Sequence, residues 1–189
     1  MRTDNFVDTL RRRLASAAVT PSAVRNMGSP GVVKAAREFL TDKVSLKDLK
    51  DDALSGEGFS EWLDLQTTQL VAAFPEPARH WGTARKVLNI FLRDAVYNCF
   101  IRQTFQLDQL SKRLEVPVDH DVAAFLRNES SIDGQKRLPR WISIKSLNPE
   151  QNKEYQHAAK VIAEREGIDP VDVDVLAWRK MSATRQSGQ

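Results

Sequence analysis

The chain has 189 residues, of which 41% are hydrophobic and 28% are charged, and its formal net charge is +3. This composition is that of a globular protein with one buried core or two small lobes. The single cysteine excludes a disulfide framework, and the cysteine and histidine residues lack the spacing of a zinc or iron–sulfur site. No apolar segment has the length of a membrane span or the pattern of a secretion signal, so we expect a cytoplasmic protein with no membrane partner.

The positive charge is concentrated in the middle of the chain. Between Arg79 and Lys145 there are twelve Lys or Arg residues and seven Asp or Glu residues, so the remainder is slightly negative. A surface that faces phosphate groups would explain this distribution. Solvated helix faces would explain it equally well, so charge alone identifies no ligand.

Apolar residues at helical spacing dominate the N-terminal part. The pattern from Phe6 to Leu14 predicts a first helix, and residues 16–31 predict a turn with a short helix. Pro30 then begins a helix that continues to Leu40.

A polar stretch separates this part from the next helix. Residues 43–58 predict a loop, which Gly56 and Gly58 close. Apolar residues recur at helical spacing over 59–74, and the proline at position 75 ends that helix.

The longest apolar element covers residues 83–101. It is hydrophobic on most sides, which predicts a central, buried helix. A short helix over 107–114 follows, then a helix after Asp119, and residues 128–146 predict a basic loop.

The C-terminal part shows two similar helix starts. Asn148 precedes a proline and is followed three residues later by Gln151, which predicts an N-cap with a capping box. Asp169 also precedes a proline, and Gly167 between the two predicts a helix end. No segment alternates with a period of two residues, so the fold class is expected to be all-α.

A glycine-containing turn precedes the long apolar helix. In HWGTARKVLN, residues 80–89, this turn is expected to join two short helices as a hairpin. Gly82 would let the backbone approach a partner, and the first N–H groups of the helix could then meet an anion. Lys86 follows within the first turns. An ammonium is disfavoured near the positive end of a helix, and a lysine without its proton is a nucleophile.

A carboxylate downstream could act with this lysine. In EVPVDHDVAAFLR, residues 115–127, Asp119 directly precedes an apolar helical pattern and is predicted to be its N-cap. A capped carboxylate is held in one orientation, so capping and catalysis are compatible.

Together, GTARKVLNIFL and VPVDHDVAAFLR resemble the helix-hairpin-helix DNA glycosylase/lyase superfamily. Its members carry a Gly-x-Gly-x-Lys hairpin, an apolar helix and a Val-Asp-x-His-type segment. On this match, Lys86 takes the place of the Schiff-base lysine and Asp119 that of the catalytic aspartate. Their separation of 33 residues, with the Asp174 and Trp178 pair in DVDVLAWR, is most similar to the archaeal-type 8-oxoguanine DNA glycosylases.

The resemblance implies a DNA glycosylase with AP-lyase activity that acts in base excision repair. Its expected substrate is DNA containing an oxidised purine such as 8-oxoguanine, removed through a lysine Schiff base. It implies no cofactor and no metal, and we expect a monomer. The expected organisation is an N-terminal helical region over 1–75 that completes the fold, a helix-hairpin-helix catalytic region over 76–180, and a flexible tail over 181–189.

The same resemblance assigns roles to further residues. The base-binding group is Ile90, Phe91, Asp174 and Trp178, and the DNA-backbone group is Gly82, Thr83 and Arg85.

The chain departs from the family pattern at two positions. Ala84 stands where the second hairpin glycine is usual, and Asp121 stands where a histidine is usual. A carboxylate near a DNA phosphate would be repelled, which favours single strands or a smaller substrate.

Less specific interpretations remain open for each residue. Taken alone, Lys86 is typical of a surface lysine, Asp119 of a simple helix cap, and Trp178 of a core residue. Two alternative functions follow. One is a non-catalytic helical module that binds nucleic acid, and the other is an N-glycosidase that acts on free nucleosides or nucleotides.

Overall fold

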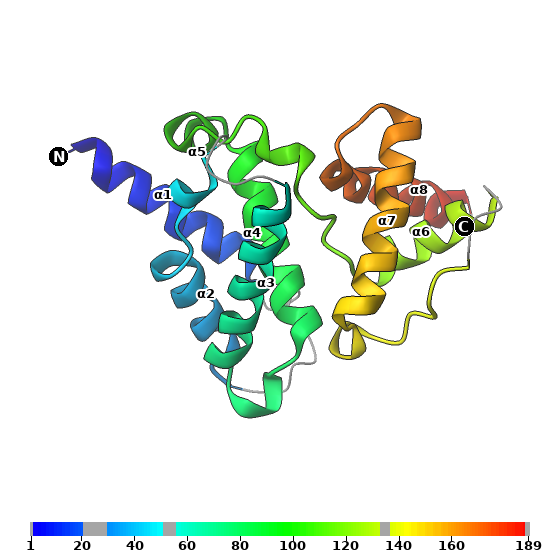
Figure 1. The fold of residues 1–189 in the computed structure, drawn as a ribbon, viewed down its shortest axis with the longest axis horizontal. Helices are drawn as coiled ribbons and strands as arrows, with labels where there is room; N and C mark the ends of the chain where they lie inside the picture. Colours follow the sequence, from blue (N-terminus) through cyan, green and yellow to red (C-terminus); the bar gives the residue numbers. More distant parts are fainter. Residues whose placement is uncertain (1, 21–29, 51–55, 133–136, 188–189) are drawn as a thin grey trace.

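The computed structural model describes residues 2–20, 30–50, 56–132 and 137–187 (Figure 1). These residues form helices and no strand, which confirms the all-α class. The α-helices are α1 (Arg2–Ala18), α2 (Val32–Asp42), α3 (Gly56–Ala73), α4 (Trp81–Tyr97), α5 (Cys99–Phe105), α6 (His120–Ile132), α7 (Pro149–Glu166) and α8 (Val173–Ser187). Short 3-10 turns connect them: η1 (Leu46–Leu49), η2 (Glu76–Ala78), η3 (Leu110–Lys112), η4 (Ile144–Ser146) and η5 (Pro170–Asp172).

The helices are arranged in two lobes, which lie side by side in Figure 1. Helices α1 to α5 surround one hydrophobic cluster, and α6 to α8 surround a second. Leu114 belongs to the first cluster and Val116 to the second, so the chain crosses between them at Glu115. The expected boundary after residue 75 falls instead inside the first lobe, between α3 and α4.

Helix α4 forms the centre of the first lobe, as its composition predicts. It packs against α1, α2 and α3, and most of its side chains are buried. The apolar element does not continue as one helix to residue 101, however. Asn98 has an extended backbone, and its side chain accepts a hydrogen bond from the N–H of Ile101 at 3.0 Å. This cap ends α4 and begins α5.

The predicted caps of the last two helices differ in outcome. The Asn148 side chain accepts a hydrogen bond from the N–H of Gln151 at 2.9 Å, as predicted, and Gly167 ends α7 with a φ of +68°. The side chain of Asp169 makes no capping bond, because a 3-10 turn, η5, comes before α8.

Other segments are more helical than expected. The 43–58 stretch contains η1 with buried Leu46 and Leu49, and the backbone of Gly56 and Gly58 already belongs to α3. Helix α6 extends to Ile132, into the expected basic loop.

The structure describes only part of the expected C-terminal tail and of the expected turn that follows the first helix. The backbone of the expected tail is helical up to Ser187, while residues 188–189 lie outside the described part. Most of the expected turn and short helix over 16–31 also lies outside it, at 21–29. Among the described residues, no helix is long and apolar enough to cross a membrane.

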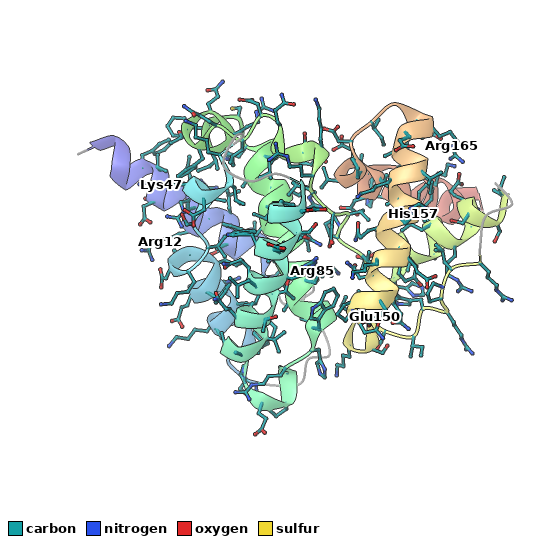
Figure 2. All side chains as sticks on the ribbon, viewed as in Figure 1. Arg12, Lys47, Arg85, Glu150, His157 and Arg165 are labelled. Atoms are coloured by element: carbon teal, nitrogen blue, oxygen red, sulfur yellow. The ribbon has the colours of Figure 1, made fainter. Side chains whose placement is uncertain are left out.

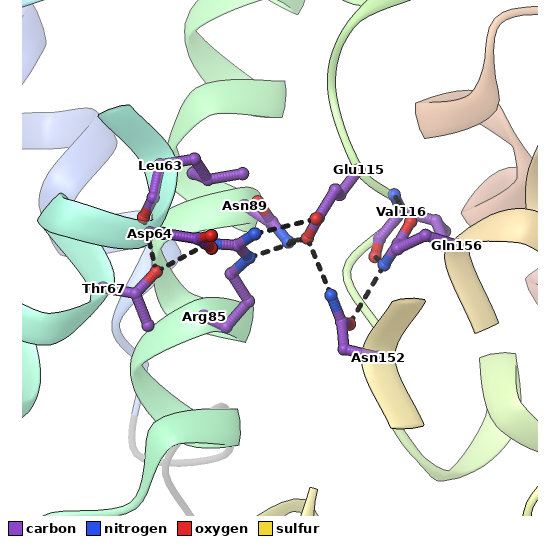
Figure 3. Close-up of polar contacts among 9 residues, drawn as sticks. All are labelled: Leu63, Asp64, Thr67, Arg85, Asn89, Glu115, Val116, Asn152 and Gln156. Carbon is purple, nitrogen blue, oxygen red and sulfur yellow. Dashed lines mark hydrogen bonds and ion pairs between the residues drawn. The ribbon is translucent and has the colours of Figure 1, made fainter. Parts of the chain in front are cut away.

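A polar network joins the lobes at the crossing point (Figure 3). Glu115 accepts two hydrogen bonds from Arg85 at 2.8 Å, one from Asn89 at 3.0 Å and one from Asn152 of α7 at 3.1 Å. Gln156 bonds both the N–H and the carbonyl of Val116, each at 2.9 Å. Helices of both lobes therefore bind the connecting segment at Glu115 and Val116 through side-chain hydrogen bonds.

The ionisation of Glu115 reflects this setting. Burial by itself would raise the pKa of Glu115, but hydrogen bonds and charge from Arg85, with the amides of Asn89 and Asn152, act more strongly. The net pKa lies below the ordinary value of 4.5. The ionised Glu115 therefore stabilises the folded protein fully when the pH is above that ordinary pKa. This contribution is lost as the pH falls through the depressed pKa.

Replacing Glu115 by Gln should destabilise the protein by about 3 kcal/mol at neutral pH, because the buried Arg85 loses its bidentate charge partner and keeps only the exposed Asp64. The difference from wild type should shrink under acid, where the wild-type carboxylate is itself protonated. Urea unfolding across a pH series measures both effects. Glu61→Gln, at an exposed position of α3, is the matched control and should change little. A deficit that stays constant down to acid pH would contradict the role given to the Glu115 charge.

Candidate active site

Lys86 and Asp119 come together at the boundary between the lobes. Lys86 lies in the second turn of α4, and Asp119 directly precedes α6. The Lys86 Nζ is 3.2 Å from the Asp119 Oδ2. The Lys86 side chain is only 15% exposed and that of Asp119 is 38% exposed, so the pair is sheltered but reachable. Residues that are distant in the sequence thus form one ion pair.

The two oxygens of Asp119 have different partners. Oδ1 accepts hydrogen bonds from the N–H groups of Asp121 and Val122, each at 3.1 Å. Oδ2 contacts Lys86. Asp119 is therefore the N-cap of α6, as predicted, and the capping bonds fix the direction in which its free oxygen points.

One face of α4 continues the site toward α8. Lys86, Ile90, Arg93 and Tyr97 follow one another at helical spacing along that face. Arg93 forms an ion pair with Asp174 of α8 and another with its own neighbour Asp94.

The charges of these two pairs influence each other. Burial raises the pKa of the Asp174 carboxyl, while Arg93 lowers it. The charge of Asp119 also raises the pKa of Asp174, and that of Lys86 lowers it. The pair at Lys86 and the pair at Arg93 are therefore parts of one electrostatic cluster.

A pocket of about 310 Å³ adjoins this cluster. Its lining consists of Arg93, Asp94, Tyr97, Asp174, Val175 and Trp178. The Trp178 side chain is 71% exposed, so it is a surface residue and not a core residue. The hydroxyl of Tyr97 donates to Asp172, and burial together with this bond raises the Tyr97 pKa well above its ordinary value. The pocket thus combines aromatic and charged groups.

The structure brings most of the predicted base-binding residues together, with one exception. Asp174 and Trp178 line the pocket, and Ile90 lies half-buried between Lys86 and Arg93 on the same helix face. Phe91 is fully buried in the first hydrophobic cluster. The helical turn of α4 points Phe91 away from the site, so the prediction that it packs on a base is wrong.

The predicted DNA-backbone residues are buried as well. Thr83 is 1% exposed and Arg85 is 5% exposed. Arg85 is occupied by its bonds to Glu115, Asp64 and Thr67. Neither side chain is available to a phosphate, which corrects the sequence-based assignment.

Gly82 serves packing and not an open hairpin. It lies in the first turn of α4, which begins at Trp81. A Cβ at this position would lie 2.3 Å from the carbonyl oxygen of Ile144 and 2.7 Å from the Cβ of Leu147. The segment around η4 therefore covers the start of α4, and the expected anion site at Gly82 is closed.

Sequence reasoning did not identify Arg93 and Tyr97. Their signal was present, because they lie seven and eleven residues after Lys86 and so share its helix face. The described residues include no group of three or more His, Cys, Asp or Glu side chains that could hold a metal ion.

This arrangement suits covalent chemistry at an electrophilic carbon. It supplies an amine, a carboxylate fixed beside it, and a neighbouring pocket with an exposed aromatic ring. Comparisons with protein-family models, with curated proteins and with solved structures gave no match to this chain.

The two roles of Asp119 can be separated by mutation. Asp119→Ala removes the cap and the ion pair, whereas Asp119→Asn keeps a capping oxygen. We expect Ala to be less stable than Asn by about 1 kcal/mol. The same difference should persist when Lys86 is replaced by Met, because capping uses Oδ1 alone. Chemical unfolding of the four variants gives the comparison. A difference that disappears in the Lys86→Met background would contradict independent roles for the two oxygens.

The close packing at Gly82 gives a second stability test. Gly82→Ala should cost about 2 kcal/mol or more, because the new Cβ meets backbone that cannot move alone. Gly167→Ala is the control: its Cβ would meet nothing within 4 Å, but φ is +68°. Strain there should cost about 1 kcal/mol. Thermal and urea unfolding measure how much stability each variant loses. A smaller loss for Gly82→Ala than for Gly167→Ala would argue against the packing of η4 on α4.

Proposed function

We propose that this chain is a DNA glycosylase with AP-lyase activity that removes an oxidised purine. The observation that carries the proposal is the contact of 3.2 Å between Lys86 Nζ and Asp119 Oδ2. Asp119 is held in place by its capping bonds, so the carboxylate is oriented before any substrate binds. Such preorganisation is what a carboxylate needs to act on a developing positive charge.

The reaction begins when Lys86 passes a proton to Asp119 and becomes a neutral amine. Its nitrogen then bonds to the sugar C1′, while the bond from C1′ to the base breaks and the base leaves with the electron pair. Loss of a second proton from the nitrogen and opening of the sugar ring give an imine. In the elimination that follows, a general base removes a proton from C2′, a double bond forms between C2′ and C3′, and the 3′ phosphate leaves with the electrons of its C–O bond, which nicks the strand.

The pocket beside the pair would receive the base. A base within a duplex must first be flipped out, at a cost of a few kcal/mol. Trp178 offers an exposed aromatic face for stacking. Asp174 can accept from an N–H edge of the base and Arg93 can donate to a carbonyl, and both line the pocket. An oxidised purine carries both kinds of group.

A specific observation favours a second candidate. Gly82, Thr83 and Arg85 are buried, so the expected contact with a duplex backbone is missing. An N-glycosidase that acts on free nucleosides or nucleotides would not need that contact. It would use the same lysine, carboxylate and pocket on a substrate with a single base.

Borohydride trapping tests the proposal directly. Borohydride reduces the imine to a stable amine, so wild-type protein should become covalently linked to lesion-bearing oligonucleotides. Lys86→Gln should abolish the adduct. Asp119→Asn should slow its formation by about 100-fold or more, because proton transfer is lost. Lys34→Gln, at an exposed position of α2, is the matched control and should trap like wild type.

The panel should include oxidised purines in single strands and in duplexes, with free nucleosides assayed alongside for base release. Base release from nucleosides without any trapping on DNA would favour the second candidate. If neither substrate class reacts, the enzymatic proposal fails, and a non-catalytic module that binds nucleic acid is left.

A further inference from the structure

A second cavity lies at the lobe boundary, on the Arg85 face of α4, and the reaction proposed above does not use it. Its volume is about 510 Å³, which is within the range of small-molecule sites. Helix α3 contributes Asp64 to it, the first turn of α4 contributes Trp81, and α7 contributes Asn152. Arg85 and His157 approach it from the two lobes (Figure 2).

The α4 side of this cavity is already paired internally. Arg85 is bound to Glu115 through two hydrogen bonds and to Asp64 at 2.9 Å. The only carboxylates in the lining, Asp64 and Glu115, are both engaged by this one guanidinium. These three groups together carry a net charge of −1, so any attraction for an anion must come from the other side of the cavity.

The α7 side is different, because no ion pair within the described part of the chain involves its two lysines, Lys153 and Lys160. Lys153, His157 and Lys160 lie at positions i, i+4 and i+7 of α7, all exposed and all facing the cavity. Within the described part of the chain, no carboxylate forms an ion pair with any of them. Arg113 adds a further guanidinium to the lining. An anion bound between Lys153 and Lys160 would accept charge-assisted hydrogen bonds from both ammonium groups, and the imidazole of His157 between them offers a further donor.

An aromatic ring completes the site. Trp81 lines the cavity and is half-buried, and the Arg85 guanidinium lies 5.2 Å from its ring centroid. The ring is thus held by a cation–π contact on the paired side of the cavity. A flat ligand group could pack against it while an attached anionic group reaches α7.

We propose that this cavity binds a nucleoside phosphate, with the base against Trp81 and the phosphate at Lys153, His157 and Lys160. The site is separate from the reaction site and does not depend on it. Glu115 lines the cavity while Asp119, four residues later, contacts Lys86. The ligand is either a free nucleotide or the phosphorylated end of a nucleic-acid strand, which share this chemistry.

Calorimetric titration of the full chain tests the site with defined probes. These are the four nucleoside 5′-monophosphates, ribose 5-phosphate, the parent nucleosides, and a short 5′-phosphorylated oligonucleotide. At least one monophosphate or the oligonucleotide should bind. Its dissociation constant should be lower than that of ribose 5-phosphate and of the parent nucleoside by a factor of about ten or more. Tight binding of a monophosphate identifies a free nucleotide as the ligand, and binding of the oligonucleotide alone identifies a strand end.

Two sets of variants locate the binding. Lys153→Gln with Lys160→Gln should weaken it at least about tenfold, because two charged contacts are lost. Lys34→Gln with Lys50→Gln, both at exposed positions of the other lobe, is the matched control and should bind like wild type. Lys86→Gln should also leave it unchanged, which separates this result from the outcome of the trapping experiment.

The proposal is overturned by any of four results. The first is that no monophosphate, and not the oligonucleotide either, binds with a dissociation constant below about 1 mM. The second is that ribose 5-phosphate binds as tightly as these ligands. The third is that the Lys153→Gln, Lys160→Gln variant binds like wild type, and the fourth is that Lys86→Gln removes the binding. Circular dichroism and urea unfolding of the lysine variants establish that any lost affinity is not lost folding, and both lysines are exposed, so the fold should persist.

Discussion

The ion pair between Arg85 and Glu115 determines how the two lobes meet. A buried charge is costly unless it is well paired, and here a bidentate contact and two side-chain amides satisfy the carboxylate. Arg85 is the residue before Lys86, and Glu115 is four residues before Asp119. The pairing therefore also sets the register that brings Lys86 to Asp119. Both candidate sites depend on this contact.

Helix α4 can serve two sites because it lies between the lobes. Arg85 and Asn89 face the connecting segment and α7, while Lys86 and Arg93 face α6 and α8. A helix in this position is buried on most sides and still carries charged side chains. The cations Arg85, Lys86 and Arg93 each have a carboxylate partner from another element, which is how a mainly apolar helix can hold them.

The same physical property supports different roles for a residue. Gly82 permits close approach, which the sequence pattern assigned to a DNA phosphate and the fold uses for the backbone at Ile144. Arg85 is a good phosphate ligand and an equally good carboxylate ligand, and Glu115 is the group it meets. The local pattern showed that these residues can make such contacts but not which partners they have, because a partner from a distant segment leaves no local pattern.

The order of residues was enough to predict the all-α class, the central helix and the caps at Asn148, Asp119 and Gly167. Those features depend on hydrogen bonds within a few residues, so the local residue types are sufficient. The burial of Phe91, the exposure of Trp178 and the division of the chain at Glu115 could be read only from the folded protein. Burial depends on which helix faces meet, and that is settled by packing between segments far apart in the chain.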